Sequence, residues 1–164
     1  MSSTLYVDSL IEKTSGNGVH IPGHVIQVVN SYYASAVQVT SSSYTNSGLS
    51  GVITPKFSNS KIMIIVSMAG AGAVISGGND AEGQFQLIRG STSIFTSHQR
   101  SYDYGGSGTI QFSSQALSWL DSPATTNATT YTLQMKRFSS TGSIRINQDQ
   151  GTGGSNITLM EIAQ

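Results

Sequence analysis

The stretch Lys61-Ile-Met-Ile-Ile-Val66 is apolar on both of its alternating faces, and the interpretation of the whole chain starts from it. In an extended strand, one side carries Ile62, Ile64 and Val66 and the other side carries Met63 and Ile65. A strand of this kind is covered on both sides. Two explanations fit: loops of the same chain cover the outer face, or a neighbouring subunit does.

Short β-patterned segments recur on both sides of this stretch, rich in Val, Ile, Thr and aromatic residues and separated by Ser, Asn and Gly. The expected strands are residues 25–29, 37–39, 49–53, 61–66, 84–89, 92–95, 109–112 with 117–120, 131–138, 143–146 and 156–162. Roughly eight to ten strands with essentially no helix predict an all-β antiparallel sandwich of the jelly-roll type. An immunoglobulin-like sandwich is the alternative, less favoured because the chain has no cysteine framework.

The N-terminal 25 residues differ from this body. Residues 5–13 alternate as a strand would, although Val7, Leu10 and Ile11 also suit one face of a helical turn. We favour a strand because the segment is short and poor in helix formers. Ser15-Gly-Asn-Gly18 and Pro22-Gly23 predict turns. The sequence therefore predicts a short stem over residues 1–25 and a β-sandwich head over residues 26–164.

The composition narrows the class of protein. Eight basic and eight acidic residues give a formal net charge of +0, and charged residues make up only 10% of the 164. Nucleic-acid binding is not expected, because a basic excess is needed to neutralise phosphates. With no cysteine, disulfides and thiolate chemistry are absent. No secretory signal or membrane-spanning stretch is visible, so we expect a soluble protein made in a cytoplasm.

Catalytic patterns are missing, and one loop stands out as a binding candidate. The sequence has no Gly-x-Ser-x-Gly elbow and no phosphate-binding glycine pattern, and its carboxylates are scattered. We therefore expect no enzyme activity, no cofactor and no metal site. Arg100, Tyr102 and Tyr104 lie in a glycine-rich loop whose composition is typical of adaptable binding surfaces. Tyrosines that merely cap a small sandwich are the alternative.

Several stretches carry a resemblance that runs nearly from end to end. They are residues 3–10, 21–29, 49–55, 60–62, 120–126 with Tyr131, and 157–162. In these stretches the chain resembles small bacteriophage virion proteins of the tail-fibre, head-fibre or appendage type, common in marine phages. These motifs are structural, and none of them is catalytic.

The resemblance implies a homotrimeric head of the C1q or tumour-necrosis-factor type on a stem that binds other virion proteins. The expected trimer interface consists of Ile62, Ile64, Val66, Ile157, Leu159 and Ile162. The expected attachment residues are Leu5, Tyr6, Val7, Leu10 and Ile11. The expected function is a virion structural protein, a surface fibre, appendage or capsid decoration, made in the host cytoplasm. The alternatives are a receptor-binding tip for host-surface glycan and, less favoured, a polysaccharide depolymerase.

Overall fold

The described part of the chain is built from ten β-strands and contains no helix. The computed structural model describes residues 6–14, 16, 19, 21–75, 80–102, 113–139, 141–148 and 153–164, and Asp80 and Tyr102 by their backbone only. The strands are β1 (Val25–Tyr33), β2 (Val37–Val39), β3 (Thr45–Ile53), β4 (Lys61–Val74), β5 (Asp80–Arg89), β6 (Thr92–Tyr102), β7 (Ser113–Asp121), β8 (Thr129–Arg137), β9 (Ser143–Ile146) and β10 (Ser155–Ile162).

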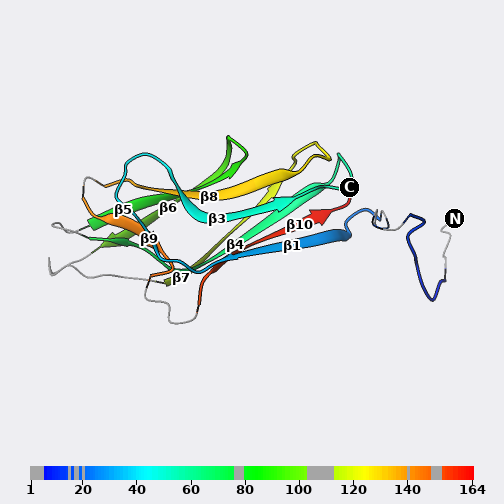
Figure 1. Ribbon diagram of the computed structural model, residues 1–164, viewed down its shortest axis with the longest axis horizontal. Helices are drawn as coiled ribbons and strands as arrows, with labels where there is room; N and C mark the ends of the chain where they lie inside the picture. Colours follow the sequence, from blue (N-terminus) through cyan, green and yellow to red (C-terminus); the bar gives the residue numbers. More distant parts are fainter. Residues whose placement is uncertain are drawn as a thin grey trace.

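The strands form two antiparallel sheets packed as a sandwich (Figure 1). The first sheet has the order β1-β10-β4-β9-β2, and β7 also pairs with β4. The second sheet has the order β3-β8-β5-β6. The expected all-β antiparallel sandwich is confirmed. The strand expected over residues 109–112 lies outside the described residues.

The core lies between the two sheets and follows from the two-residue period of the strands. The first sheet contributes Ile62, Ile64, Val66, Ile157 and Leu159, and the second contributes Phe85, Leu87, Tyr131, Leu133 and Met135. All ten are almost completely buried. Burying a side chain of this size stabilises a fold by about 1.5–3 kcal/mol. One continuous core therefore holds both sheets together.

Strand β4 runs the length of the sandwich and defines its two ends. Its 14 residues span roughly 40 Å. It pairs with β10 over residues 61–67, with β7 over residues 62–71, and with β9 over residues 72–74. We call the end with Val25 and Ile162 the stem end and the opposite end, with Val74, the far end.

The N-terminal segment is not a strand, so the expectation of a strand over residues 5–13 is wrong for the described residues 6–13. None of the described strands lies beside it, and an isolated strand has no ladder of hydrogen bonds to hold it. Residues 6–14 lie beyond the stem end (Figure 1). Residues 15, 17 and 18 of the first expected turn lie outside the described residues.

The turn expected at Pro22-Gly23 is confirmed and joins the stem to the sandwich. The His24 N–H donates to the Ile21 carbonyl over 3.0 Å, and Gly23 has a φ of 85°, which glycine adopts readily. The Gly23 N–H donates to the Ala163 carbonyl, and the Ala163 N–H donates to the His24 carbonyl. Two backbone hydrogen bonds therefore hold this corner against the C-terminal residues, and β1 begins at Val25 directly after it.

Candidate functional surfaces

The N-terminal segment presents apolar side chains that nothing in the sandwich covers. Tyr6 is 91% exposed and Ile11 is 82% exposed, and Val7 and Leu10 are more than half exposed. Leu5, the fifth expected attachment residue, lies outside the described residues. Exposed apolar groups collected on one segment are typical of a surface that binds another protein. The arrangement leaves these four side chains available to a partner.

The expected trimer interface needs correction, because five of its six residues belong to the core of a single chain. Ile62, Ile64, Val66, Ile157 and Leu159 are completely buried against the second sheet. Their side chains have no surface left for a neighbouring subunit. Ile162 differs, since it is half-buried. The physical reason is that side chains alternate along a strand, and these five point inward, toward the second sheet.

The opposite face of these strands carries a row of accessible apolar residues. The register places Val28 beside Met160, Met160 beside Met63, and Met63 beside Leu120, across β1, β10, β4 and β7. Val28 is 57% exposed and Leu120 is 43% exposed, while the two methionines are half-buried. Ile65 and Ile162 flank the row. We call these six residues the apolar row. No segment among the described residues buries it.

The expected receptor loop is only partly within the described residues. Arg100, near the end of β6, is exposed, and its Nε lies 3.2 Å from Glu82 Oε1. His98 Nε2 lies 3.4 Å from Glu82 Oε2. The side chain of Tyr102 and the whole of Tyr104 lie outside the described residues. Arg100 is therefore placed on the outer face of the second sheet, at the far end.

Two residues that the sequence analysis missed complete this surface. Phe138 is 54% exposed, and its ring meets the edge of the His98 ring at 5.0 Å between centroids. Lys136 Nζ lies 5.7 Å from the centre of the Phe138 ring and 4.6 Å from that of Tyr44. We call Glu82, His98, Arg100, Lys136 and Phe138 the far-end patch. The sequence did carry one signal for this patch, because the aromatic residue Phe138 directly follows Lys136 and Arg137 at the end of a strand.

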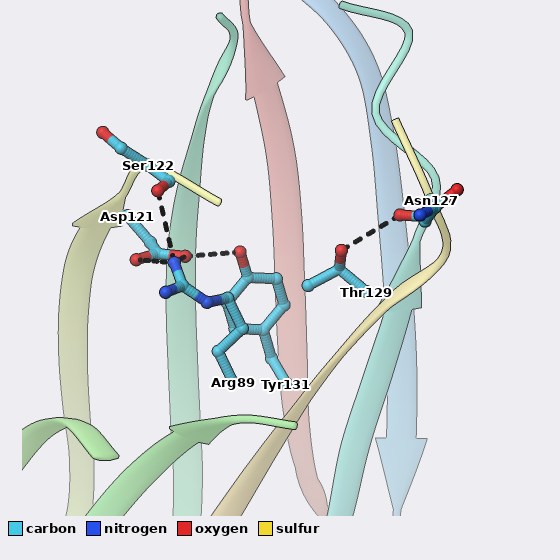
Figure 2. Close-up of polar contacts among 6 residues, drawn as sticks. All are labelled: Arg89, Asp121, Ser122, Asn127, Thr129 and Tyr131. Carbon is cyan, nitrogen blue, oxygen red and sulfur yellow. Dashed lines mark hydrogen bonds and ion pairs between the residues drawn. The ribbon is translucent and has the colours of Figure 1, made fainter. Parts of the chain in front are cut away.

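A buried polar cluster ties the two sheets together near the stem end (Figure 2). Arg89 Nη1 on β5 lies 2.8 Å from each carboxylate oxygen of Asp121, at the end of β7, and donates to the Ser122 carbonyl. The Tyr131 hydroxyl on β8 donates to Asp121 Oδ2 over 2.7 Å. Burial, and then the hydrogen bond and charge of Asp121, raise the pKa of Tyr131 well above its ordinary value of 10. Both carboxylate oxygens of Asp121 are engaged by residues of the second sheet, so the cluster joins the two sheets.

A second buried carboxylate anchors the turn before β4. Glu161 accepts hydrogen bonds from Gln27 Nε2 (2.6 Å) and from the backbone N–H groups of Lys56 (2.8 Å) and Phe57 (3.1 Å). Burial opposes ionisation of this carboxyl, but the hydrogen bonds outweigh it and lower its pKa below the ordinary 4.5. The sequence signal that we missed was a lone acid on the inward alternation of an apolar strand.

The described part of the chain was also searched for metal-binding clusters and for membrane-spanning helices. No three His, Asp or Glu side chains gather there in a way that could hold a metal ion. Within the same residues, no helix is long and apolar enough to cross a membrane. The described surfaces with binding potential are therefore the N-terminal segment, the apolar row and the far end.

Comparison with known proteins finds no family for this chain. No protein-family model matches it, and no curated protein matches its sequence. Among solved structures, it is similar to the crystal structure of dimeric latent PorU from Porphyromonas gingivalis, with a TM-score of 0.39 and 10% identity. The match covers 90% of this chain and only 14% of the PorU chain. A likeness this distant assigns neither a family nor a function.

Proposed function

We propose that this chain is a bacteriophage virion structural protein, displayed on the particle surface as a fibre, appendage or capsid decoration. The virion class comes from the resemblance of its sequence to small phage appendage proteins. The observation that carries the proposal is the exposed apolar segment 6–14 beside a sandwich that is complete without it (Figure 1). A docking segment outside the folded body is what an attached surface protein needs.

The geometry of the stem supports attachment through this segment. Val7, Leu10 and Ile11 make no contribution to the sandwich core, so a partner can take them up without disturbing the fold. An extended segment of this kind wraps over a partner surface and becomes ordered on binding. When several copies bind together, their effective affinity rises well above that of one segment. Weak single contacts can then hold the protein on the particle.

Homotrimerisation through the apolar row is part of the same proposal. The row lies on the outer face of the first sheet, where a neighbouring copy can cover it. The strand order also supports a C1q-like or tumour-necrosis-factor-like jelly roll, since β1, β10, β4 and β7 interleave in sequence with β3, β8, β5 and β6. In this proposal the contact between copies lies on the outward face of β4 and not on the inward face that the sequence led us to expect.

Attachment is tested on particles that carry variants of the stem. Leu10→Ser with Ile11→Ser should strongly reduce the amount of protein in purified virions, because both side chains lose their apolar contact with the partner. Ser9→Ala with Lys13→Ser is the control in the same segment and should leave incorporation unchanged. Quantitative immunoblotting of purified particles measures both, and thermal melting checks the fold. Normal incorporation of the Leu10 and Ile11 variant would contradict the docking role.

The trimer is tested by analytical ultracentrifugation of the purified chain. Met63→Glu with Leu120→Glu should dissociate the oligomer, because adjacent carboxylates cannot pack in an apolar seam. Gln86→Glu with Gln134→Glu places the same charges on the outer face of the second sheet and should leave the mass unchanged. A wild-type protein that stays monomeric at micromolar concentration would rule out the trimer.

A second candidate function is receptor binding at the far end. The far-end patch favours it, because Phe138 is exposed beside Lys136 and the Arg100–Glu82 ion pair, opposite the stem. Sugars stack on exposed aromatic rings while charged groups bind their hydroxyls. Phe138→Ala should weaken binding on an array of host-surface glycans, and Phe57→Ala at the stem end should not. A blank array for the wild type, with normal phage adsorption, would dismiss this function.

We do not carry the depolymerase alternative forward. A glycosidase needs two carboxylates that flank its substrate. Within the described sandwich, Glu82, Asp121 and Glu161 are each engaged by cationic side chains or hydrogen-bond donors. Loss of viscosity when the purified protein is added to host polysaccharide would revive that alternative.

A further inference from the structure

A polar pocket opens at the far end of the sandwich, apart from the apolar row. It has a volume of about 550 Å³ and lies where β2, β9 and the ends of β4 and β8 meet. Its polar lining consists of Gln38, Thr40, Arg137, Thr141, Ser143 and Arg145. Small-molecule sites have volumes of about 300–1,000 Å³, so this pocket can hold a ligand the size of one sugar.

The charge of the pocket is one-sided. Two arginines, Arg137 and Arg145, line it, and none of its described lining residues is Asp or Glu. The Arg145 Nε–H donates to Ser143 Oγ over 3.2 Å, which orients that guanidinium. Arg137 Nε is buried and has no hydrogen-bond acceptor among the described residues. The lining therefore combines two cationic side chains with polar groups and has no carboxylate among the described residues.

One wall of the pocket is formed by Thr141 and Gly142, in the described part of the loop between β8 and β9, and by Ser143 at the start of β9. The Ser139 hydroxyl donates to the Thr141 carbonyl over 2.6 Å, and the Ser139 N–H donates to the Glu82 carbonyl over 3.2 Å. Gly142 has a φ of 87°, and a side chain there would collide with the carbonyl oxygen of Val74. Only glycine lets this loop lie so close to the end of β4. The pocket is therefore formed before any ligand arrives.

We infer that this pocket binds an acidic sugar through its carboxylate or phosphate group. Guanidinium groups bind oxyanions through paired N–H donors, which a carboxylate or a phosphate matches. The hydroxyl and amide groups of Thr40, Thr141, Ser143 and Gln38 provide partners for sugar hydroxyls. The pocket is a different site from the far-end patch. The inference rests on the receptor-binding candidate for one point only, namely that the sugar comes from a host-surface polymer.

Isothermal titration calorimetry of the purified chain tests this inference with glucuronate, glucose 6-phosphate, glucose and inorganic phosphate. Both acidic sugars should bind, and affinity should fall between about 50 mM and about 500 mM NaCl, because the attraction is between charges. Glucose should not bind detectably. Equal affinity for glucose would overturn the role of the oxyanion, and binding of inorganic phosphate alone would overturn the role of the sugar.

Variants separate the pocket from the rest of the molecule. Arg145→Gln and Arg137→Gln should each weaken glucuronate binding at least about tenfold, and Arg145→Lys should recover part of it. Thr141→Trp should block the pocket without changing its charge. Lys56→Gln removes one positive charge near the stem end and should have no effect. Unchanged affinity in folded Arg145→Gln and Thr141→Trp proteins, judged by melting, would overturn the site.

The same titrations distinguish this inference from the receptor-binding candidate. Phe138→Ala acts on the far-end patch and should leave glucuronate binding to the pocket intact. Glucuronate binding without any signal on a host glycan array would keep the pocket and reject the receptor role. Absence of both acidic-sugar signals at millimolar ligand would reject the pocket itself.

Discussion

The two sheets share one core, yet they present opposite surfaces to the outside. The first sheet shows the apolar row, with Val28, Met63, Met160 and Leu120 side by side. The second shows mainly polar groups at the equivalent alternation, among them Gln86, Thr96 and Gln134, with the exposed Val52 on its edge strand β3 as an apolar exception. The alternation is the same on both sheets, and only the chemistry of the outward set differs.

This difference indicates which of the two outer faces is suited to contact with water. A sheet with an apolar inner face and a polar outer face is complete when it packs on one core. A sheet that is apolar on both faces has a second surface to cover. The outer face of the second sheet therefore needs no further cover, and the outer face of the first sheet is suited to contact another copy.

The largest expected effect compares the two faces of a single strand. Ile64→Ala should destabilise the fold by about 2–5 kcal/mol, because it leaves a cavity in the core. Ile65→Ala removes the same atoms from the outward face and should cost less than about 1 kcal/mol in the dissociated chain. Urea unfolding at a concentration where the chain is monomeric measures both. Equal losses would mean that the two faces are covered alike.

The next effect concerns the cluster that joins the two sheets (Figure 2). Asp121→Ala leaves the half-buried Arg89 and the buried Tyr131 hydroxyl without their shared acceptor, and should cost about 1.5–3 kcal/mol. Tyr131→Phe removes one donor only and should cost less. Chemical unfolding of both variants ranks them. A larger loss for Tyr131→Phe would contradict the assignment of Asp121 as the centre of the cluster.

A smaller effect depends on pH and on Glu161. Because folding lowers the pKa of this carboxyl, its ionised form stabilises the protein above the ordinary pKa of 4.5. That contribution is lost as the pH falls through the lowered pKa of the folded state. Thermal melting from neutral pH downward should show a steeper loss below pH 4.5 for the wild type than for Glu161→Gln. Parallel curves would mean that Glu161 does not anchor the turn at Lys56.

The smallest expected effect compares single outward residues on the two sheets. Leu120→Ser and Thr96→Ser should each change the free energy of unfolding of the monomer by no more than about 0.5 kcal/mol. Only Leu120→Ser should weaken self-association, because only the apolar row is proposed to contact another copy. Sedimentation across a dilution series measures this difference. Equal effects on association would remove the distinction between the two outer faces.

Much of the fold could be predicted from short stretches of sequence. The predictions that were wrong share one cause, which is that they depended on residues far away in the chain. The strands expected over residues 25–29 and 61–66 were found, because a two-residue period is visible in neighbouring residues, although β1 and β4 extend further, to Tyr33 and Val74. Residues 6–13 were misassigned because a strand also needs a partner, which its own sequence does not show. The inward face of β4 was expected to contact other copies, because two apolar faces look alike until the second sheet is in place.

The candidate sites were harder to predict, since their parts are far apart in the chain. Gln38 and Arg145 line one pocket because β2 pairs with β9. Arg89, Asp121 and Tyr131 meet because two sheets close on one core. The exposed stem residues Tyr6 and Ile11 were identified from sequence, because their apolar character needs no distant partner to be noticed.

The sequence by itself determined an all-β chain with little charge, no cysteine and an apolar N-terminal segment, because composition and period are local properties. The tertiary structure decided which face of Ile62 to Val66 is core, which row remains open, and that two arginines share a pocket at the far end. These outcomes depend on strand pairing between distant residues. Pairing is set by the packing of the whole sandwich, and no single stretch of the chain encodes it.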